Sequence, residues 1–123
     1  MESITRNREQ IGMIVLRLGL AGVYLFFGFS QLFDGASWVR IVPEWATTLS
    51  HLSPAVLVLA NGVMEVVLGT LLALGFWVTP VAAILSLHLF VIASGFGFVA
   101  TGIRDYGLAL ATAALAFLGG KRG

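Results

Sequence analysis

The chain has 123 residues and a formal net charge of +1, with 59% hydrophobic and only 11% charged residues. Soluble domains carry roughly 25% charged residues, so this composition excludes a water-soluble globule. No basic surface is available for nucleic acid, and the lack of cysteine excludes thiol chemistry, iron–sulfur clusters and cysteine-based zinc sites, so we expect no metal site.

Four long apolar segments predict an all-α fold, a bundle of four transmembrane helices that forms one domain over residues 1–123. A helix needs about 20 apolar residues to cross the hydrocarbon core, so the chain is long enough for four spans and little else. Ser53 before Pro54 is a typical helix start, and Thr79 before Pro80 repeats it. The expected spans are residues 11–33, 54–76, 80–100 and 103–119, and the last is near the minimum length.

The connection between the first two spans, Asp34 to Ser53, is the only long one. Its apolar residues recur at steps of three and four, as on one face of a helix, and Pro43 must interrupt that helix. We therefore predict a short interfacial or re-entrant helix whose Trp38 and Trp45 anchor the chain at the headgroup level. The alternative is a lid over a cavity in the bundle.

The positive charges predict the orientation of the bundle. Arginine and lysine residues are more frequent on the cytoplasmic side of membrane proteins. One side of this chain carries Arg6, Arg8, Lys121 and Arg122, and the other carries only Arg40 and Arg104. We therefore expect both termini in the cytoplasm, which agrees with an even number of spans.

The most informative ionisable residues lie inside the first three expected spans: Arg17, Glu65 and His88. Counted at 1.5 Å per residue from the cytoplasmic end of each span, they lie at depths of about 9, 16 and 12 Å. Asn61 lies one helical turn from Glu65. The four side chains are therefore predicted to form one polar layer, which includes an Arg17–Glu65 ion pair.

This predicted layer has two interpretations. It is a polar staple that fixes the register of the helices, because polar groups hold membrane helices together. Alternatively, Glu65 and His88 are the catalytic candidates and handle protons beside a small-molecule pocket, because intramembrane acids and histidines mark proton relays. A haem site is disfavoured, because the only other histidine, His51, lies in the long connection.

A second charged cluster is expected at the outer end of the bundle. Asp34 follows the first span, and Arg104 and Asp105 begin the fourth. We predict an Asp34–Arg104 bridge that closes this end, with Asp105 as the N-cap of the fourth span.

Several short motifs resemble the DoxX family. In the first span these are Leu16-Arg17-Leu18, then Gly22, Phe26 and Phe27, then Gly28-Phe29-Ser30-Gln31-Leu32. Glu65 followed by Gly69 and Leu72 resembles the second span of that family, and Arg104-Asp105 resembles the start of its last. Gln31 differs from the family pattern, which usually has lysine there, and this difference removes a positive charge from the outer mouth.

The resemblance implies a small four-helix protein of the bacterial inner membrane that works with quinone-linked oxidoreductases. Arg17 and Glu65 match intramembrane charges of the family, and Arg104 with Asp105 matches its Arg-Asp pair. The implied cofactor is a quinone.

The leading hypothesis is therefore an accessory or quinone-interacting subunit of a membrane oxidoreductase. The chain has no self-contained catalytic motif, so electrons would come from a protein partner. The alternative is a non-catalytic structural subunit that packs against a larger membrane complex. A third hypothesis, a small-molecule transporter, rests on the glycine-rich break at Gly95 to Gly97. The expected partners are the lipid bilayer and either a membrane protein or a second copy of this chain.

Overall fold

A computed structural model of the protein describes residues 2–96 and 100–122, and this part of the chain contains six α-helices and no strand. The all-α prediction is confirmed for these residues. In chain order the helices are α1 (Glu2–Phe33), α2 (Ala36–Val39), α3 (Glu44–Ser50), α4 (Pro54–Leu74), α5 (Val78–Phe96) and α6 (Ala100–Arg122).

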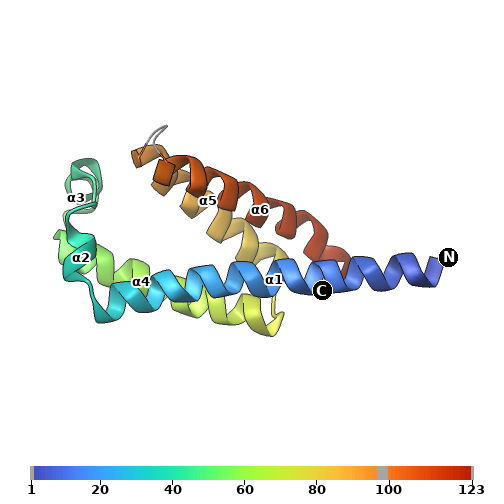
Figure 1. The fold of residues 1–123 in the computed structure, drawn as a ribbon. Coiled ribbons are helices and arrows are strands. Elements are labelled where there is room, and N and C mark those ends of the chain that lie inside the picture. The colour runs from blue at the N-terminus through green and yellow to red at the C-terminus, as the bar shows by residue number, and fades with distance from the viewer. Residues whose placement is uncertain (1, 97–99, 123) are drawn as a thin grey trace.

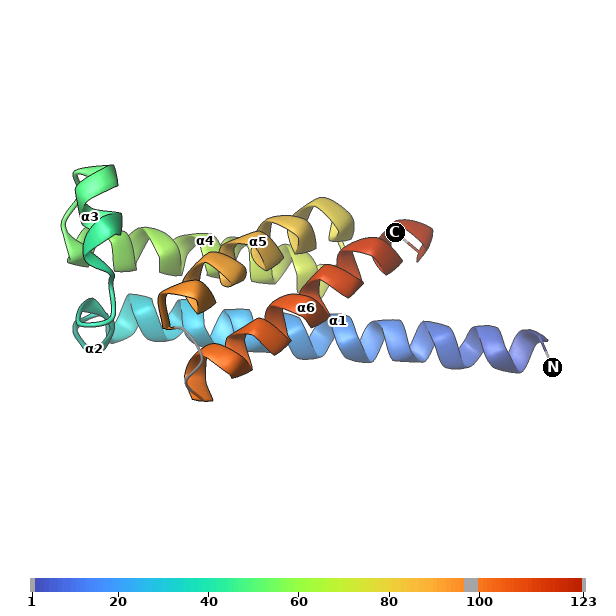
Figure 2. The same cartoon turned by 90° about the horizontal axis from the view of Figure 1, so that it is seen from above.

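The four long helices form two antiparallel hairpins. Helix α1 packs along α4, and α5 packs along α6 (Figure 1). Helices α2 and α3 lie at one end of the bundle, here called the loop end. Helix α1 begins and α6 ends toward the opposite end, here called the terminal end (Figure 2). The two hairpins converge toward the terminal end and separate toward the loop end (Figure 1).

The ends of α4 follow from its sequence. Ser53 accepts a hydrogen bond from the backbone N–H of Val56 at 3.3 Å, and Pro54 is the first helical residue, as predicted. Gly75 ends the helix with φ 83°, a conformation that glycine adopts without steric cost. Helix α5 begins at Val78, two residues before Pro80, because the first helical turn needs no N–H donor at a proline.

Within residues 2–96 and 100–122, three helical segments are long and apolar enough to cross a membrane: Ser3–Phe33, Pro54–Leu74 and Val78–Gly95. Helix α6 has the length of a span, but it carries Arg104 and Asp105, so the four-span count stays a prediction. The prediction of Asp105 as N-cap is wrong. Helix α6 begins at Ala100, which places Asp105 in its second turn. Gly97, part of the expected break in the third span, lies outside the described residues.

The long connection folds into α2 and α3, which are separated at Pro43. Trp38 packs back onto α1, where its Nε1 donates to Ser30 Oγ at 2.9 Å and its ring meets Phe27 edge-on at 5.8 Å. Trp45 is half exposed, and α3 has no buried residue. The position of this segment at a membrane interface stays a prediction.

Helices α1 and α4 approach each other closely at Gly28 and Gly62. A Cβ atom added to Gly28 would lie 2.8 Å from Val66 Cγ2 and 3.0 Å from the carbonyl oxygen of Gly62. A Cβ atom on Gly62 would lie 3.0 Å from the carbonyl oxygen of Gly28. Glycine is therefore required on both sides, because close packing of backbones holds helices together in lipid.

Gly28→Ala should destabilise the folded protein by about 1–3 kcal/mol, because the added methyl group forces the two helix backbones apart. The matched control is Gly22→Ala, on the same helix, where an added Cβ meets no atom within 4 Å. The check is the free energy of unfolding in mild detergent titrated with a denaturing detergent. Equal stability of the two variants would contradict the assigned contact.

Candidate functional site

The centre of the buried polar region is Glu65 on α4, whose exposed fraction is only 4%. Asn61 lies one turn earlier on the same helix, and its Nδ2 donates to Glu65 Oε1 at 2.9 Å. The same Nδ2 donates to Oε1 of Gln31 on α1 at 2.6 Å. One amide group therefore joins α1 to the Glu65 carboxyl group.

His88 on α5 completes this group, with its Nε2 at 3.9 Å from Glu65 Oε1. We call Gln31, Asn61, Glu65 and His88 the Glu65 cluster. The cluster joins the two hairpins, because its members come from α1, α4 and α5. The structure thus brings together Asn61, Glu65 and His88 of the predicted polar layer, and it adds Gln31.

Two atoms of the Glu65 cluster are buried without a hydrogen-bond partner among the described residues, namely Glu65 Oε2 and His88 Nε2. A buried polar group left unpaired costs about 1–3 kcal/mol, so such atoms are rare in folded proteins and call for an explanation. Glu65 and His88 can therefore form a hydrogen bond with a further group between α4 and α5.

A second buried polar contact lies between α1 and α6. The hydroxyl groups of Tyr24 and Thr112 are 2.9 Å apart, and Thr112 donates its only hydroxyl proton to the carbonyl oxygen of Leu108 at 2.7 Å. Tyr24 is therefore the donor to Thr112. Tyr24 also lies within electrostatic range of both Glu65 and Asp105. With His88 of α5, polar groups from all four long helices therefore meet in this region.

Arg17 lies outside the Glu65 cluster, which corrects its predicted place in the polar layer. Arg17 lies beside Gly75, the residue that ends α4 at the terminal end. A Cβ atom added to Gly75 would lie 3.2 Å from Arg17 Nη1. The depth estimate fails because it takes Ile11 as the start of the span, whereas α1 begins at Glu2 and continues past the end of α4. A cation at this position is favourable, because the carbonyl end of a helix carries partial negative charge.

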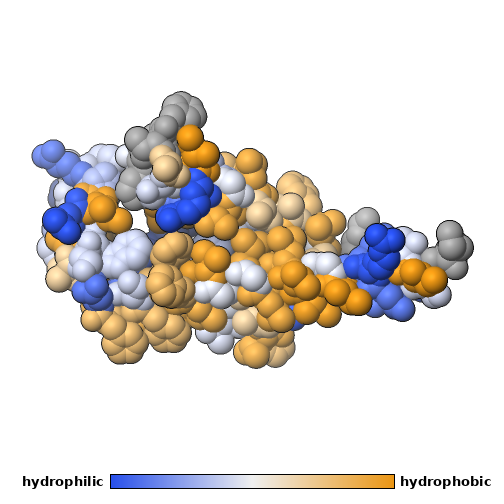
Figure 3. Space-filling model, in the orientation of Figure 1, coloured by the Kyte–Doolittle hydropathy of each residue, from blue (hydrophilic) through white to orange (hydrophobic). Residues whose placement is uncertain are grey.

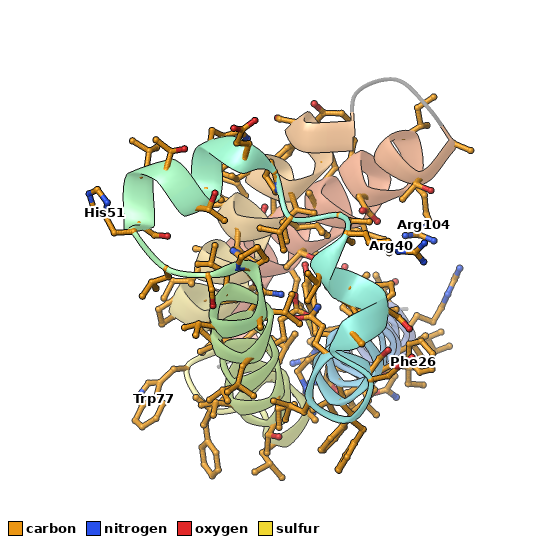
Figure 4. The ribbon with its side chains drawn as sticks, turned by 90° about the vertical axis from the view of Figure 1, so that its left-hand side faces the viewer. Phe26, Arg40, His51, Trp77 and Arg104 are labelled. Carbon is orange, nitrogen blue, oxygen red and sulfur yellow. The ribbon has the colours of Figure 1, made fainter. Side chains whose placement is uncertain are left out.

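The charged residues at the loop end also differ from the prediction. Arg104 pairs with its neighbour Asp105, at 3.1 Å from Nη2 to Oδ1, and its guanidinium lies over the Phe27 ring at 5.7 Å. Asp34 accepts a hydrogen bond from Ser37 Oγ at 2.8 Å. Among the described residues, the predicted Asp34–Arg104 bridge is replaced by these two local contacts. Figure 4 looks onto this end and shows Arg40 and Arg104 on one side of it and His51 on the other.

Two contacts escaped the sequence analysis. Gln31 stood out as a polar residue in an apolar span, but the sequence does not reveal which helix it faces. The Tyr24–Thr112 bond joins residues 88 positions apart, and hydroxyl groups are too common in membrane helices to signal such a pair. The described residues contain no group of three or more His, Cys, Asp or Glu side chains that could hold a metal ion.

The sequence model of the DoxX family matches residues 12–102 of the chain. The matched region contains α2, α3, α4 and α5, most of α1, and the whole Glu65 cluster. Neither the curated proteins nor the solved structures gave a match.

The hydrogen bond between Asn61 and Gln31 should appear as a coupling energy in a double-mutant cycle. Combining Gln31→Leu with Asn61→Leu should give a coupling of about 0.6–1.7 kcal/mol, as found for hydrogen bonds between membrane helices. The control cycle pairs Gln31→Leu with Thr70→Val, because Thr70 is exposed and donates to the carbonyl oxygen of Val66 within its own helix. Unfolding free energies measure both cycles, and equal couplings would remove the assigned bond.

Arg17 and Glu65 should behave as independent sites. Arg17→Gln should lower stability by about 0.3–1 kcal/mol through the lost interaction with the end of α4, and Arg8→Gln, on the exposed start of α1, should change it little. Adding Glu65→Gln to Arg17→Gln should give additive effects on the unfolding free energy. A large coupling energy would restore the ion pair that the sequence predicted.

Proposed function

We propose, since the chain belongs to the DoxX family, that it is an accessory or quinone-interacting subunit of a membrane oxidoreductase. The family and the apolar helices make it a multi-pass membrane protein with lipid around it. We assign the bacterial cytoplasmic membrane as its location, with both termini in the cytoplasm. The start of α1 and the end of α6 lie toward the same end, which supports a common side for both termini, and the excess of Arg and Lys near them supports the cytoplasm as that side (Figure 2).

The observation that carries the proposal is the unpaired carboxyl and imidazole pair inside an apolar bundle. Glu65 Oε2 and His88 Nε2 are buried, close together and without partners among the described residues. A quinone head offers carbonyl oxygens that accept hydrogen bonds, and its apolar tail suits the surrounding helices. The residues present therefore fit such a group at Glu65 and His88.

The residues of the cluster have separate tasks in this proposal. Asn61 holds Glu65 through Oε1, and this contact leaves Oε2 free to hold a proton or to release one. His88 carries a second exchangeable proton at Nε2 or accepts one there. When bound, a quinone supplies two-electron chemistry coupled to the uptake of protons. In this proposal a protein partner supplies the electrons.

A structural role without chemistry is the second candidate, and the bond from Asn61 to Gln31 favours it. That bond fixes the register of α1 against α4 next to the Gly28–Gly62 contact. The Glu65 cluster would then only fix how the helices pack, so that the bundle fits a larger membrane complex. Transport has the weakest support, because part of the helix break that suggested it lies outside the described residues.

Purification of the tagged protein from its native membrane in mild detergent should recover a redox protein and a quinone together. Mass spectrometry of the proteins and of the extracted lipids measures both. A partner without any quinone would favour the structural role. Recovery of the protein with bulk lipid alone would contradict both the accessory role and the structural role.

Glu65→Gln should abolish quinone-linked electron transfer in membranes while leaving the protein inserted, because the amide cannot release a proton. The matched control is Glu44→Gln, an exposed acid at the start of α3 that is not part of the cluster. Both variants need immunoblots of the membrane fraction to show equal amounts of protein. Unchanged electron transfer in Glu65→Gln would remove this carboxyl group from the mechanism.

A further inference from the structure

Most of the buried polar side chains that the structure describes lie in the half of the bundle nearest the loop end; the exception is Arg17, whose Nε is buried without a partner beside Gly75 at the terminal end. The pairs Gln31–Asn61 and Glu65–His88 lie in the half nearest the loop end, and Tyr24–Thr112 marks the limit of this polar half. Asp105 is buried near the same level and lies within electrostatic range of Glu65. Beyond Tyr24 and Thr112, the next ionisable side chain toward the terminal end on α1 is Arg17, beside Gly75.

The other half of the bundle is closed by apolar side chains, which we call the apolar plug. Leu20, Leu72 and Leu115 lie one or two turns closer to the terminal end than Tyr24, Glu65 and Thr112 respectively. All three are almost fully buried, and Leu85 and Ala82 of α5 belong to the same core. Apolar side chains from all four long helices therefore lie between the Glu65 cluster and Arg17.

The loop end is built differently. The two hairpins separate there, and blue, hydrophilic surface lies at this end of the described residues (Figures 1 and 3). Val58 and Ala93 are among the buried apolar residues at this level. Arg104, whose side chain is 55% exposed, extends the polar region from Asp105 to the surface.

The unpaired atoms of the Glu65 cluster need a partner that lipid cannot supply. A buried water typically makes two to four hydrogen bonds to polar groups, and Glu65 Oε2 and His88 Nε2 offer two. Inside a membrane, such a water must come from a polar opening toward one surface. The distribution of polar and apolar side chains leaves the loop end as that opening.

We propose that the bundle is a water-filled half-channel, open at the loop end and closed by the apolar plug, through which Glu65 and His88 exchange protons with one side of the membrane only. The ionisable groups that face Glu65 in it are Tyr24 from α1, His88 from α5 and Asp105 from α6. The half-channel does not depend on a bound quinone. In this proposal, protons reach Glu65 and His88 from the side of the membrane where α2 and α3 lie.

Single cysteines test this proposal on a clean background, because the chain has no cysteine. Asn61→Cys places a thiol in the cluster, and Ala82→Cys places one in the apolar plug with little change in size. Thr48→Cys and Ser3→Cys are exposed markers for the loop-end side and the terminal-end side. A permanently charged, membrane-impermeant methanethiosulfonate is applied to intact spheroplasts and to inverted vesicles without added quinone, and the remaining thiols are then counted.

The reagent reacts with thiolates, which form where water reaches the sulfur. Asn61→Cys should react at least about tenfold faster from the side that labels Thr48→Cys than from the side that labels Ser3→Cys, because only that side supplies water to ionise its thiol. Ala82→Cys should stay unlabelled from both sides. Gln31→Cys repeats the measurement if Asn61→Cys fails to fold.

Two results would overturn the half-channel. Cluster cysteines labelled from the Ser3→Cys side, or from neither side, would refute access from the loop end. Labelling of Ala82→Cys would refute the apolar plug. A quinone assay that fails while the labelling pattern holds would refute the proposed function and leave the half-channel standing, so the two failures are distinguishable.

Discussion

The contact between Gly28 and Gly62 sets the register of α1 against α4, and the arrangement of the buried polar groups follows from that register. Because the two backbones touch there, Gln31 meets Asn61 one turn toward the loop end, and Arg17 meets Gly75 at the terminal end. A bulkier residue at either glycine would separate the amide of Asn61 from Gln31, and Glu65 would then lose its link to α1.

A carboxyl group and an imidazole at this depth are expensive in a protein that buries so much apolar surface. Ionisable residues in membrane spans usually face the interior of a bundle and have a functional reason to be there. In this bundle Asn61 satisfies one oxygen of Glu65 and leaves the other unpaired, although a fully satisfied network would stabilise the fold better. An unpaired carboxyl oxygen of this kind favours the proposed proton-handling role of Glu65 over a purely structural one.

The sequence was sufficient for the helical class, the start of α4 and the contact of Asn61 with Glu65, because each depends on composition or on spacing along one helix. Counting residues along two spans also placed His88 near Glu65, because only a short turn joins α4 to α5. The sequence was insufficient for Arg17, because the level of a side chain depends on where its helix begins, and α1 begins nine residues before the apolar run. The Asp34–Arg104 bridge failed for a similar reason. Ser37 and Asp105 are the nearer partners once α2 and α6 have formed.

The close pairing of α5 with α6 bears on how the chain enters a bilayer during synthesis. A lone α6 would carry Arg104 and Asp105 into lipid, and each charge costs about 2.5–3.5 kcal/mol at the centre of a span. In the folded bundle Asp105 is buried, and Arg104, its neighbour in α6, pairs with it. A fourth span would therefore insert as a unit with the third, and a ribosome-bound chain that ends before α6 should expose the α5 face that α6 later covers.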